Sequence, residues 1–156
     1  MQKINVSWSA DSDAANCEIS LAALKKHAPF AIKVVLVDDS SLVRLRLAAL
    51  LSSLDGVAIT GQAENITIGR LLLEQQNPDV LILDINFPGE NGLTLLKFAR
   101  LRDKSLKIIM LSSNNHPKLR EKCAELGANF YFHKPTEIEN AFDVCRELAS
   151  CRAVNP

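Results

Sequence analysis

The strongest constraint on how this chain folds is a two-part pattern that repeats between residues 31 and 150. Each repeat begins with a short run rich in Val, Ile and Leu and continues with a longer stretch whose apolar residues have helical spacing. Short apolar runs of this kind are typical of strands that helices cover on both faces. We expect strands at Lys33–Val37, Val57–Thr60, Val80–Leu83, Lys107–Leu111 and Phe130–Phe132.

The stretches between these runs carry the start and stop signals of α-helices. Ser40 or Ser41 can cap the first helix, and Gly56 lies where its C-terminal cap is expected. Pro78 and Gly127 follow two of the later stretches, and both residue types are common just beyond the end of a helix. The four later helices are expected at Ile66–Gln76, Asn91–Arg102, Pro117–Leu126 and Thr136–Ser150.

Strands that alternate with helices predict an α/β fold, here a doubly wound five-stranded parallel sheet with five helices on its two faces. The functional residues of such sheets lie at the carboxyl ends of the strands, so the residues directly after each apolar run are the candidates for a site. We place this domain at residues 31–153 and interpret residues 1–30 as an N-terminal extension. A possible extra helix at Asp11–His27 is either a local appendage of the domain or a partner-binding arm.

Composition narrows the class of protein further. The 156 residues include 18 Lys and Arg against 18 Asp and Glu, so the net charge is zero and gives no support for direct binding to nucleic acid. No apolar run approaches the roughly 20 residues that cross a bilayer, so we expect no contact with a membrane. The four cysteines lack metal-type spacing, which favours reduced, mostly buried thiols in a cytoplasmic protein.

Acidic residues follow two of the expected strands. Asp38 and Asp39 come directly after the first run, and Asp84 follows the third. Carboxylates that meet at one edge of a sheet repel each other, and a hard divalent cation relieves this repulsion. Mg²⁺ suits a site with few protein ligands because it keeps several waters. Asp39 and Asp84 would be direct ligands, Asp38 would bind directly or through water, and the backbone carbonyl of Asn86 is a third candidate ligand.

A hydroxyl and an amine follow the remaining strands of interest. Ser112 and Ser113 end the fourth run, and Lys134 with Pro135 ends the fifth. Each of these residues alone is commonly a helix cap, a turn residue or a surface lysine. At one edge with three carboxylates, however, a hydroxyl and a lysine can hold the oxygens of a phosphoryl group. The combination predicts phosphoryl transfer onto Asp84, a step that needs mainly positioning and charge neutralisation.

The residues discussed above lie in four short segments of the sequence. Residues 34–40 read VVLVDDS, residues 81–92 read LILDINFPGENG, residues 108–113 read IIMLSS, and residues 127–135 read GANFYFHKP. With these motifs at this spacing, residues 32 to about 150 resemble a response-regulator receiver domain of two-component signalling. The resemblance implies the flavodoxin-like receiver fold and covers more than three quarters of the chain.

The resemblance also implies roles for individual residues. Asp84 would be the phospho-acceptor, and Asp38 and Asp39 would hold Mg²⁺. Ser112 would be the switch hydroxyl, and Lys134 would contact the phosphoryl group. These positions all match the pattern of the family.

The resemblance further implies partners and a switching mechanism. A histidine kinase or a histidine phosphotransfer protein would donate the phosphoryl group, as in a phosphorelay. Ser112 would then move inward, and Tyr131, at the aromatic switch position, would follow it. The face built from the fourth helix, the fifth strand and the fifth helix would bind a downstream protein. Such a chain is a signalling phosphoacceptor rather than an enzyme, and at most it catalyses its own phosphorylation and dephosphorylation.

Three hypotheses remain at this point. The chain ends at Pro156, soon after the last expected helix, which favours a stand-alone receiver. The second hypothesis is a receiver cut from a longer regulator with a DNA-binding or enzymatic output domain. The third is a phosphatase with an aspartyl-phosphate nucleophile, but such an enzyme needs a second Asp where this chain has Asn86.

Overall fold

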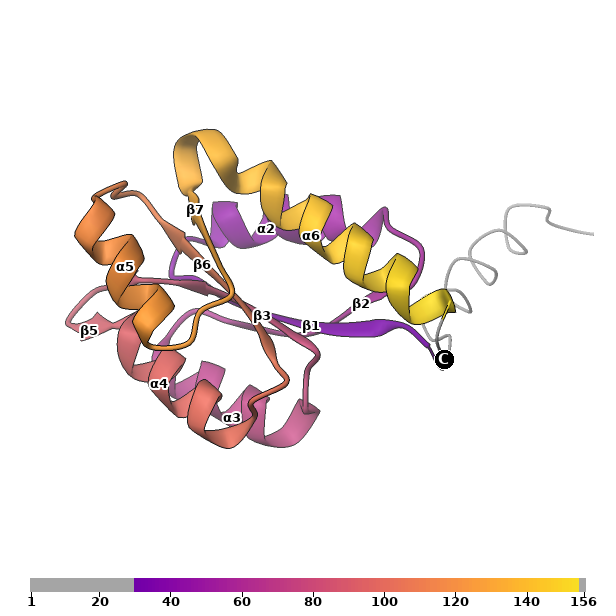
Figure 1. Cartoon of the computed structure of the whole chain (residues 1–156), viewed down its shortest axis with the longest axis horizontal. Coiled ribbons are helices and arrows are strands. Elements are labelled where there is room, and N and C mark those ends of the chain that lie inside the picture. The colour runs from indigo at the N-terminus through magenta and orange to yellow at the C-terminus, as the bar shows by residue number, and fades with distance from the viewer. Residues whose placement is uncertain (1–29, 155–156) are drawn as a thin grey trace, which may run out of the picture.

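A parallel sheet organises residues 30–154, which are the residues that the computed structural model describes (Figure 1). The strands lie in the order β2-β1-β3-β6-β7, so the predicted doubly wound α/β fold is confirmed. A two-stranded antiparallel hairpin follows β3 and was not predicted. The sheet strands are β1 Ile32–Val37, β2 Val57–Ala63, β3 Val80–Asp84, β6 Lys107–Ser112 and β7 Phe130–His133, and the hairpin strands are β4 Asn86–Phe87 and β5 Glu90–Asn91.

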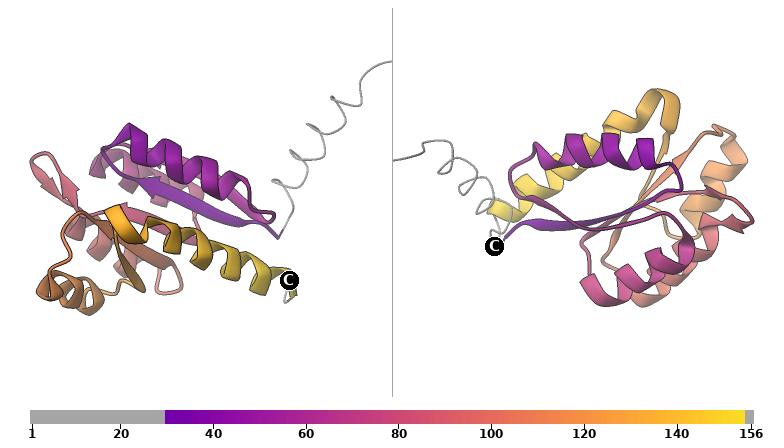
Figure 2. Two further views of the ribbon diagram at one scale, coloured as in Figure 1. Left: turned by 90° about the horizontal axis from the view of Figure 1, so that it is seen from above. Right: turned by 180° about the vertical axis from the view of Figure 1, so that it is seen from behind.

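The described residues form five helices, in the places where the sequence predicts them. Two helices, α2 and α6, cover one face of the sheet, and the other three cover the opposite face (Figure 2). No helix in this part of the chain is long and apolar enough to cross a membrane. The helices are α2 Ser41–Ser52, α3 Ile66–Gln76, α4 Gly92–Arg102, α5 Pro117–Glu125 and α6 Lys134–Val154.

Each strand of the sheet contributes to two hydrophobic cores, one on either face. In β3, for example, Leu81 and Leu83 pack with α3, α4 and α5, whereas Val80 and Ile82 pack with α2 and α6. All four side chains are at most 1% exposed. This double burial explains why the strands read as uninterrupted apolar runs rather than as alternating patterns.

The register of the sheet brings the carboxyl ends of its central strands together. Val37 at the end of β1 is paired with Leu83 of β3, and Asp84 is paired with Leu111 of β6. On the far side, Ser112 at the end of β6 is paired with His133 at the end of β7. The residues that follow these strands therefore emerge along one edge.

The end of helix α2 differs from the prediction. Ser40 is the N-cap as predicted, and its hydroxyl accepts a hydrogen bond from the Val43 N–H. The helix stops at Ser52 rather than near Gly56, because Ser53 binds the Leu50 carbonyl through its hydroxyl as well as its N–H. Gly56 instead lies in the turn into β2, with a φ of 76° that glycine adopts without strain.

Helix α6 is longer than predicted at both ends. It begins at Lys134 instead of Thr136 and continues to Val154 instead of Ser150. Proline is tolerated in a first helical turn, and the Glu137 carboxylate accepts the His133 N–H just before the helix. The extra C-terminal turn contains Arg152, which forms an ion pair with Asp79.

Two further predictions concern the N-terminal extension and the thiols. The extension at residues 1–30, with its possible helix at 11–27, lies outside the described residues except for Phe30. Cys123 and Cys145 are buried as expected, and burial raises the pKa of these thiols to about 11 and about 12. Cys151 is exposed.

Candidate functional site

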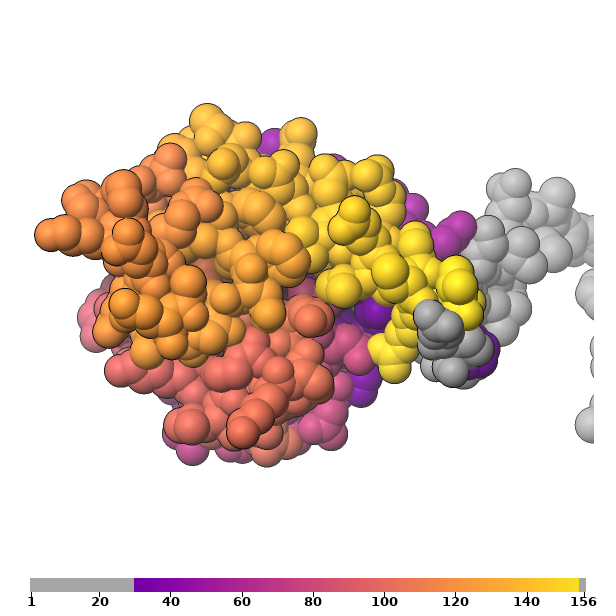
Figure 3. Space-filling view, viewed as in Figure 1, coloured from indigo at the N-terminus to yellow at the C-terminus, as the bar shows by residue number. Residues whose placement is uncertain are grey.

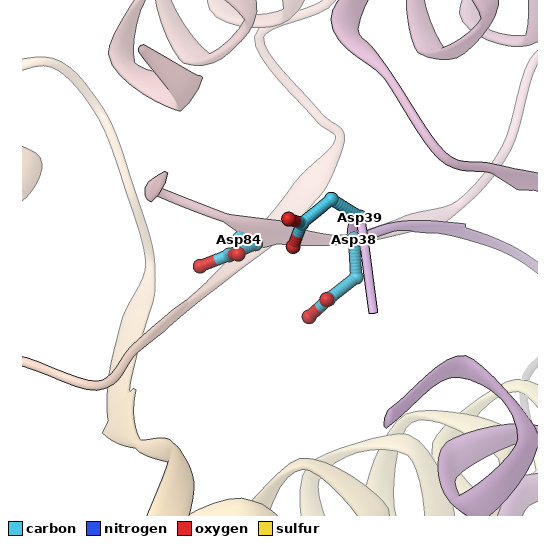
Figure 4. Close-up of side chains that lie close together, drawn as sticks. All are labelled: Asp38, Asp39 and Asp84. Carbon is cyan, nitrogen blue, oxygen red and sulfur yellow. The ribbon is translucent and has the colours of Figure 1, made fainter. Parts of the chain in front are cut away.

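Three carboxylates lie together at the carboxyl edge of the sheet (Figure 4). Asp38 and Asp39 follow β1, Asp84 is the last residue of β3, and their carboxylate oxygens lie within 4.8 Å of one another. Asp38 and Asp84 are each 2% exposed, whereas Asp39 is open to solvent. The predicted convergence of these three residues is therefore found in the structure.

Backbone groups and one lysine orient the two buried carboxylates. The Ser40 N–H donates to Oδ1 of Asp38 at 2.9 Å, and the Asn86 N–H donates to Oδ1 of Asp84 at 3.2 Å. Nζ of Lys134 lies 2.7 Å from Oδ2 of Asp38 and 2.9 Å from Oδ2 of Asp84. One ammonium group thus bridges both carboxylates, and the cluster keeps an excess of two negative charges.

Burial and pairing shift the proton affinities of this cluster. Desolvation raises the pKa of Asp84 above its usual value, although the neighbouring Lys134 ammonium acts in the opposite direction. Desolvation disfavours the charged form of Lys134, but its contacts with Asp38 and Asp84 outweigh this effect and raise the pKa of Lys134. The lysine is therefore held in its charged form beside the carboxylates.

A cavity of about 510 Å³ opens beside the carboxylates. Its lining has polar or charged side chains and a smaller set of apolar ones from α2 and α6. The polar or charged residues are Asp39, Ser40, Arg46, Asp84, Asn86, Ser113 and Lys134, and the apolar ones are Leu42, Val43, Pro135 and Ile138. Asn86, a predicted site residue, thus lines the cavity beside Asp84. The cavity gives a small anionic group access to Asp84 next to a fixed positive charge.

Ser112 and Tyr131 meet at one peptide segment behind this cavity. Ser112 ends β6 and is fully buried, and its Oγ accepts a hydrogen bond from the Asn114 N–H at 3.0 Å. Tyr131 on β7 is 6% exposed, and its hydroxyl donates to the Asn114 carbonyl. Asn114 therefore links the Ser112 hydroxyl at the end of β6 to the Tyr131 ring on the neighbouring strand.

Two side chains next to Tyr131 were not predicted from the sequence. The Arg120 guanidinium of α5 lies over the Tyr131 ring, 4.8 Å from its centroid. His133, two residues after Tyr131 on the same strand face, lies 3.2 Å through Nε2 from the Ser113 carbonyl. Arg120 lies outside the four quoted segments, and His133 lies within the segment 127–135 but was assigned no role. The two-residue strand spacing from Tyr131 could have indicated His133.

Comparisons with known proteins agree with this geometry. Residues 34–146 match the response regulator receiver domain family. The nitrate/nitrite response regulator protein NarL of Escherichia coli strain K12 is 33% identical over 119 residues, which are 75% of this chain and 54% of NarL. The protein-glutamate methylesterase/protein-glutamine glutaminase of Treponema pallidum strain Nichols is 34% identical over 112 residues, which are 70% of this chain and 28% of that protein. The chain thus spans about half of the first relative and less than a third of the second.

Solved structures give the same result for the fold. The isolated receiver domain of RcsB from Salmonella enterica serovar Typhimurium, studied with the phosphomimetic BeF3-, has a TM-score of 0.67 at 25% identity. The similarity covers 78% of this chain and 98% of that one. A CheY-like receiver domain protein from Methanospirillum hungatei JF-1 has a TM-score of 0.70 at 19% identity, over 81% of this chain and 99% of that one.

Proposed function

Because the chain belongs to the response regulator receiver domain family, we propose that it accepts a phosphoryl group on Asp84 and so switches a protein-binding face. The observation that carries this proposal is the cluster of carboxylates at the carboxyl edge of the sheet. Asp38 and Asp84 share one lysine, and the Asp39 carboxylate lies within 4.8 Å of both, so a cation can bind next to a nucleophilic carboxylate. Family membership also argues against the aspartyl-phosphate phosphatase hypothesis.

We propose Mg²⁺ as the cation of this site. The three carboxylates are hard oxygen donors, they lie close enough together for one ion, and the open cavity leaves room for its waters. Asp39 and Asp84 would bind it directly, Asp38 directly or through water, and the Asn86 backbone carbonyl would add a further oxygen. The ion would neutralise negative charge on the phosphoryl group.

The reaction is the transfer of a phosphoryl group from a phosphohistidine to a carboxylate. An Asp84 carboxylate oxygen attacks phosphorus, the P–N bond to the donor imidazole breaks, and an O–P bond forms. The Lys134 ammonium and the Ser112 hydroxyl then donate to the peripheral phosphoryl oxygens. The donor is a histidine kinase or a histidine phosphotransfer protein.

The output of this reaction is a change in a protein-binding surface. When Ser112 turns toward the phosphoryl group, its Oγ gives up the Asn114 N–H, and Tyr131, which binds the Asn114 carbonyl, responds. The Tyr131 ring packs against Arg120 of α5, and the segments of α5 and α6 form a continuous surface in Figure 3. We therefore assign the downstream partner to the α5–β7–α6 face, and we propose a cytoplasmic protein without direct contact to nucleic acid.

Two forms of the protein are compatible with the proposed site, and the first is a stand-alone receiver. The matched relatives are longer than the shared region, so the alternative is a receiver within a longer regulator. Sequencing of the transcript around the codon for Pro156 distinguishes the two. An uninterrupted reading frame into a further domain would replace the stand-alone proposal.

Phosphorylation by a small-molecule donor tests the central claim. With Mg²⁺ and acetyl phosphate, the intact mass of the wild type should increase by one phosphate, and EDTA should prevent this. Asp84→Asn should give no adduct, because its side chain has no nucleophilic carboxylate. Asp143→Asn, which changes an exposed carboxylate on α6, is the matched control and should be labelled like the wild type. An adduct that persists in Asp84→Asn would contradict the assignment of Asp84.

A further inference from the structure

Three consecutive residues after Ser112 are each held by a side chain from β7 or α5. We call residues 113–116, which connect β6 to α5, the switch loop. The Ser113 carbonyl faces Nε2 of His133 at 3.2 Å, and the Asn114 carbonyl accepts from the Tyr131 hydroxyl. The Asn115 side chain accepts from Nη2 of Arg120 at 3.3 Å. The first two residues of the loop are therefore held by β7 and the third by α5.

The contact of His133 has a defined direction. A backbone carbonyl can only accept a hydrogen bond, so Nε2 of His133 carries the proton that points to Ser113. The other ring nitrogen, Nδ1, lies 3.0 Å from the Thr136 hydroxyl, which can donate to it. The His133 N–H donates to Oε2 of Glu137 at 2.7 Å, so the backbone of this residue is fixed as well. Both ring nitrogens thus have partners, and the imidazole is held in one orientation.

We propose that His133 is a positioning residue for the switch, which holds the Ser113 carbonyl and so stabilises the arrangement in which Ser112 binds Asn114. This inference rests on the proposed function, because it assumes that phosphorylation draws Ser112 toward Asp84. The Ser113 carbonyl lies next to Ser112 in the chain, so that movement displaces the carbonyl from the His133 ring. A contact that exists in one state alone shifts the equilibrium toward that state.

The expected size of this effect follows from a single hydrogen bond. Loss of one partly exposed hydrogen bond changes an equilibrium by about two- to tenfold. A variant without the Nε2 donor should therefore need about two- to tenfold less phosphoryl mimic than the wild type to switch half of the protein. The rate at which acetyl phosphate labels this variant should exceed that of the wild type, because the active arrangement is more populated before phosphorylation.

Two amide variants of His133 separate the Nε2 donor from the ring itself. The amide nitrogen of Gln reaches the position of Nε2, so His133→Gln keeps a donor for the Ser113 carbonyl. The shorter amide of Asn reaches only the position of Nδ1, so His133→Asn lacks that donor. Both variants lose the imidazole, and any difference between them reports on the Ser113 contact. Thr136→Val provides a further variant, because it removes the partner of Nδ1 at an exposed position with little change in volume.

The readout is the single tyrosine of the chain, Tyr131. Protein labelled with 3-fluorotyrosine should give one ¹⁹F resonance, which is followed during titration with beryllofluoride in the presence of Mg²⁺. We expect the midpoint for His133→Asn to fall about two- to tenfold below that of the wild type. His133→Gln should stay close to the wild type, and Thr136→Val should shift in the same direction as His133→Asn by a smaller factor.

Several outcomes would overturn the inference. Equal midpoints for the wild type and His133→Asn, or equal shifts for the Asn and Gln variants, would show that the donor at Nε2 does not position the loop. If His133→Asn does not fold, an unchanged midpoint in Thr136→Val has the same meaning. A wild type that gives neither a phosphate adduct nor a ¹⁹F response would instead contradict the proposed function, so the two failures are distinguishable.

Discussion

The two edges of the sheet carry similar residue types but differ in how fully their charges are paired. At the amino edge, where the strands begin, the Asp79 carboxylate accepts the Lys33 N–H at 2.7 Å and pairs with Arg152 at 2.6 Å. At the carboxyl edge, Asp38 and Asp84 share the single ammonium group of Lys134, and Asp39 adds a third negative charge. Asp79 at the first edge therefore has its own cationic partner, whereas the second edge has more carboxylates than paired cations, which is why we propose a bound cation there.

Arg100 is the clearest example of a saturated group at the amino edge. It lies in the last turn of α4, and its guanidinium donates to backbone carbonyls before β6 and after α5 as well as to the Asn129 side chain. The accepting carbonyls belong to Asp103, Lys104, Leu106 and Gly127. These bonds connect α4 to the starts of β6 and β7, so we assign Arg100 to the stability of the fold.

The contrast between the edges shows how function can be inferred from pairing. Charged side chains with partners lie at both edges, but the buried charged residues in the described part of the chain, Asp38 and Asp84, lie at the carboxyl edge. What distinguishes the carboxyl edge is that its acidic groups outnumber their partners beside an open cavity. Substitutions at the amino edge should therefore change stability and leave phosphorylation intact, whereas substitutions at the carboxyl edge should change both.

The largest stability effect is expected at the amino edge. Arg100→Met removes a charged donor from several carbonyls and leaves them without a partner, so the free energy of unfolding should fall by about 4 kcal/mol. Urea denaturation measures this loss. Under conditions where the variant is still folded, labelling of Asp84 by acetyl phosphate should proceed at the rate of the wild type. A loss of labelling in folded protein would show that the two edges are coupled and would contradict the comparison.

Lys134→Met tests the opposite edge. Without the ammonium, Asp38 and Asp84 face each other unpaired, and the free energy of unfolding should fall by about 3 kcal/mol, as for a broken buried ion pair. Mg²⁺ should restore much of this loss, because a divalent ion supplies the missing positive charge. Arg152→Met at the amino edge is the control. Its partly exposed pair should contribute at most about 1 kcal/mol, and Mg²⁺ should stabilise this variant only as much as the wild type, because the carboxylate cluster is intact. Equal responses to Mg²⁺ in both variants would refute the difference between the edges.

The sequence allowed most of this architecture to be predicted, for a physical reason. Strands covered on both faces must be apolar throughout, so a polar residue at the end of such a run marks the edge of the sheet. Asp38, Asp84, Ser112 and Lys134 were each located in this way. The predicted strand ends were less accurate where polar residues interrupt the apolar run. Strand β2, for example, continues to Ala63 rather than stopping at Thr60.

The features that escaped prediction depend on contacts between distant parts of the chain. The β4–β5 hairpin has two residues in each strand, too few for any periodicity to be visible. Arg100 reads as an ordinary basic residue in the last turn of a helix, because its carbonyl partners are brought to it only by the folded chain. His133 and Arg120 were missed for the same reason.

A pair of Asp→Asn substitutions gives the smallest but sharpest test of the comparison. Asp84→Asn should raise the free energy of unfolding at neutral pH by about 1 kcal/mol, because it removes a desolvated charge from a crowded cluster. Asp79→Asn should lower it by up to about 1 kcal/mol, because the amide keeps the hydrogen bond to Lys33 but loses the charge that pairs with Arg152.

The pKa of Asp84 is raised in the folded state, so its ionised form costs stability as the pH rises above the ordinary value of 3.8. The gain from Asp84→Asn should therefore shrink in acid, which urea denaturation across pH measures. Changes of the same sign in both variants would mean that the two edges do not differ in the pairing of their charges.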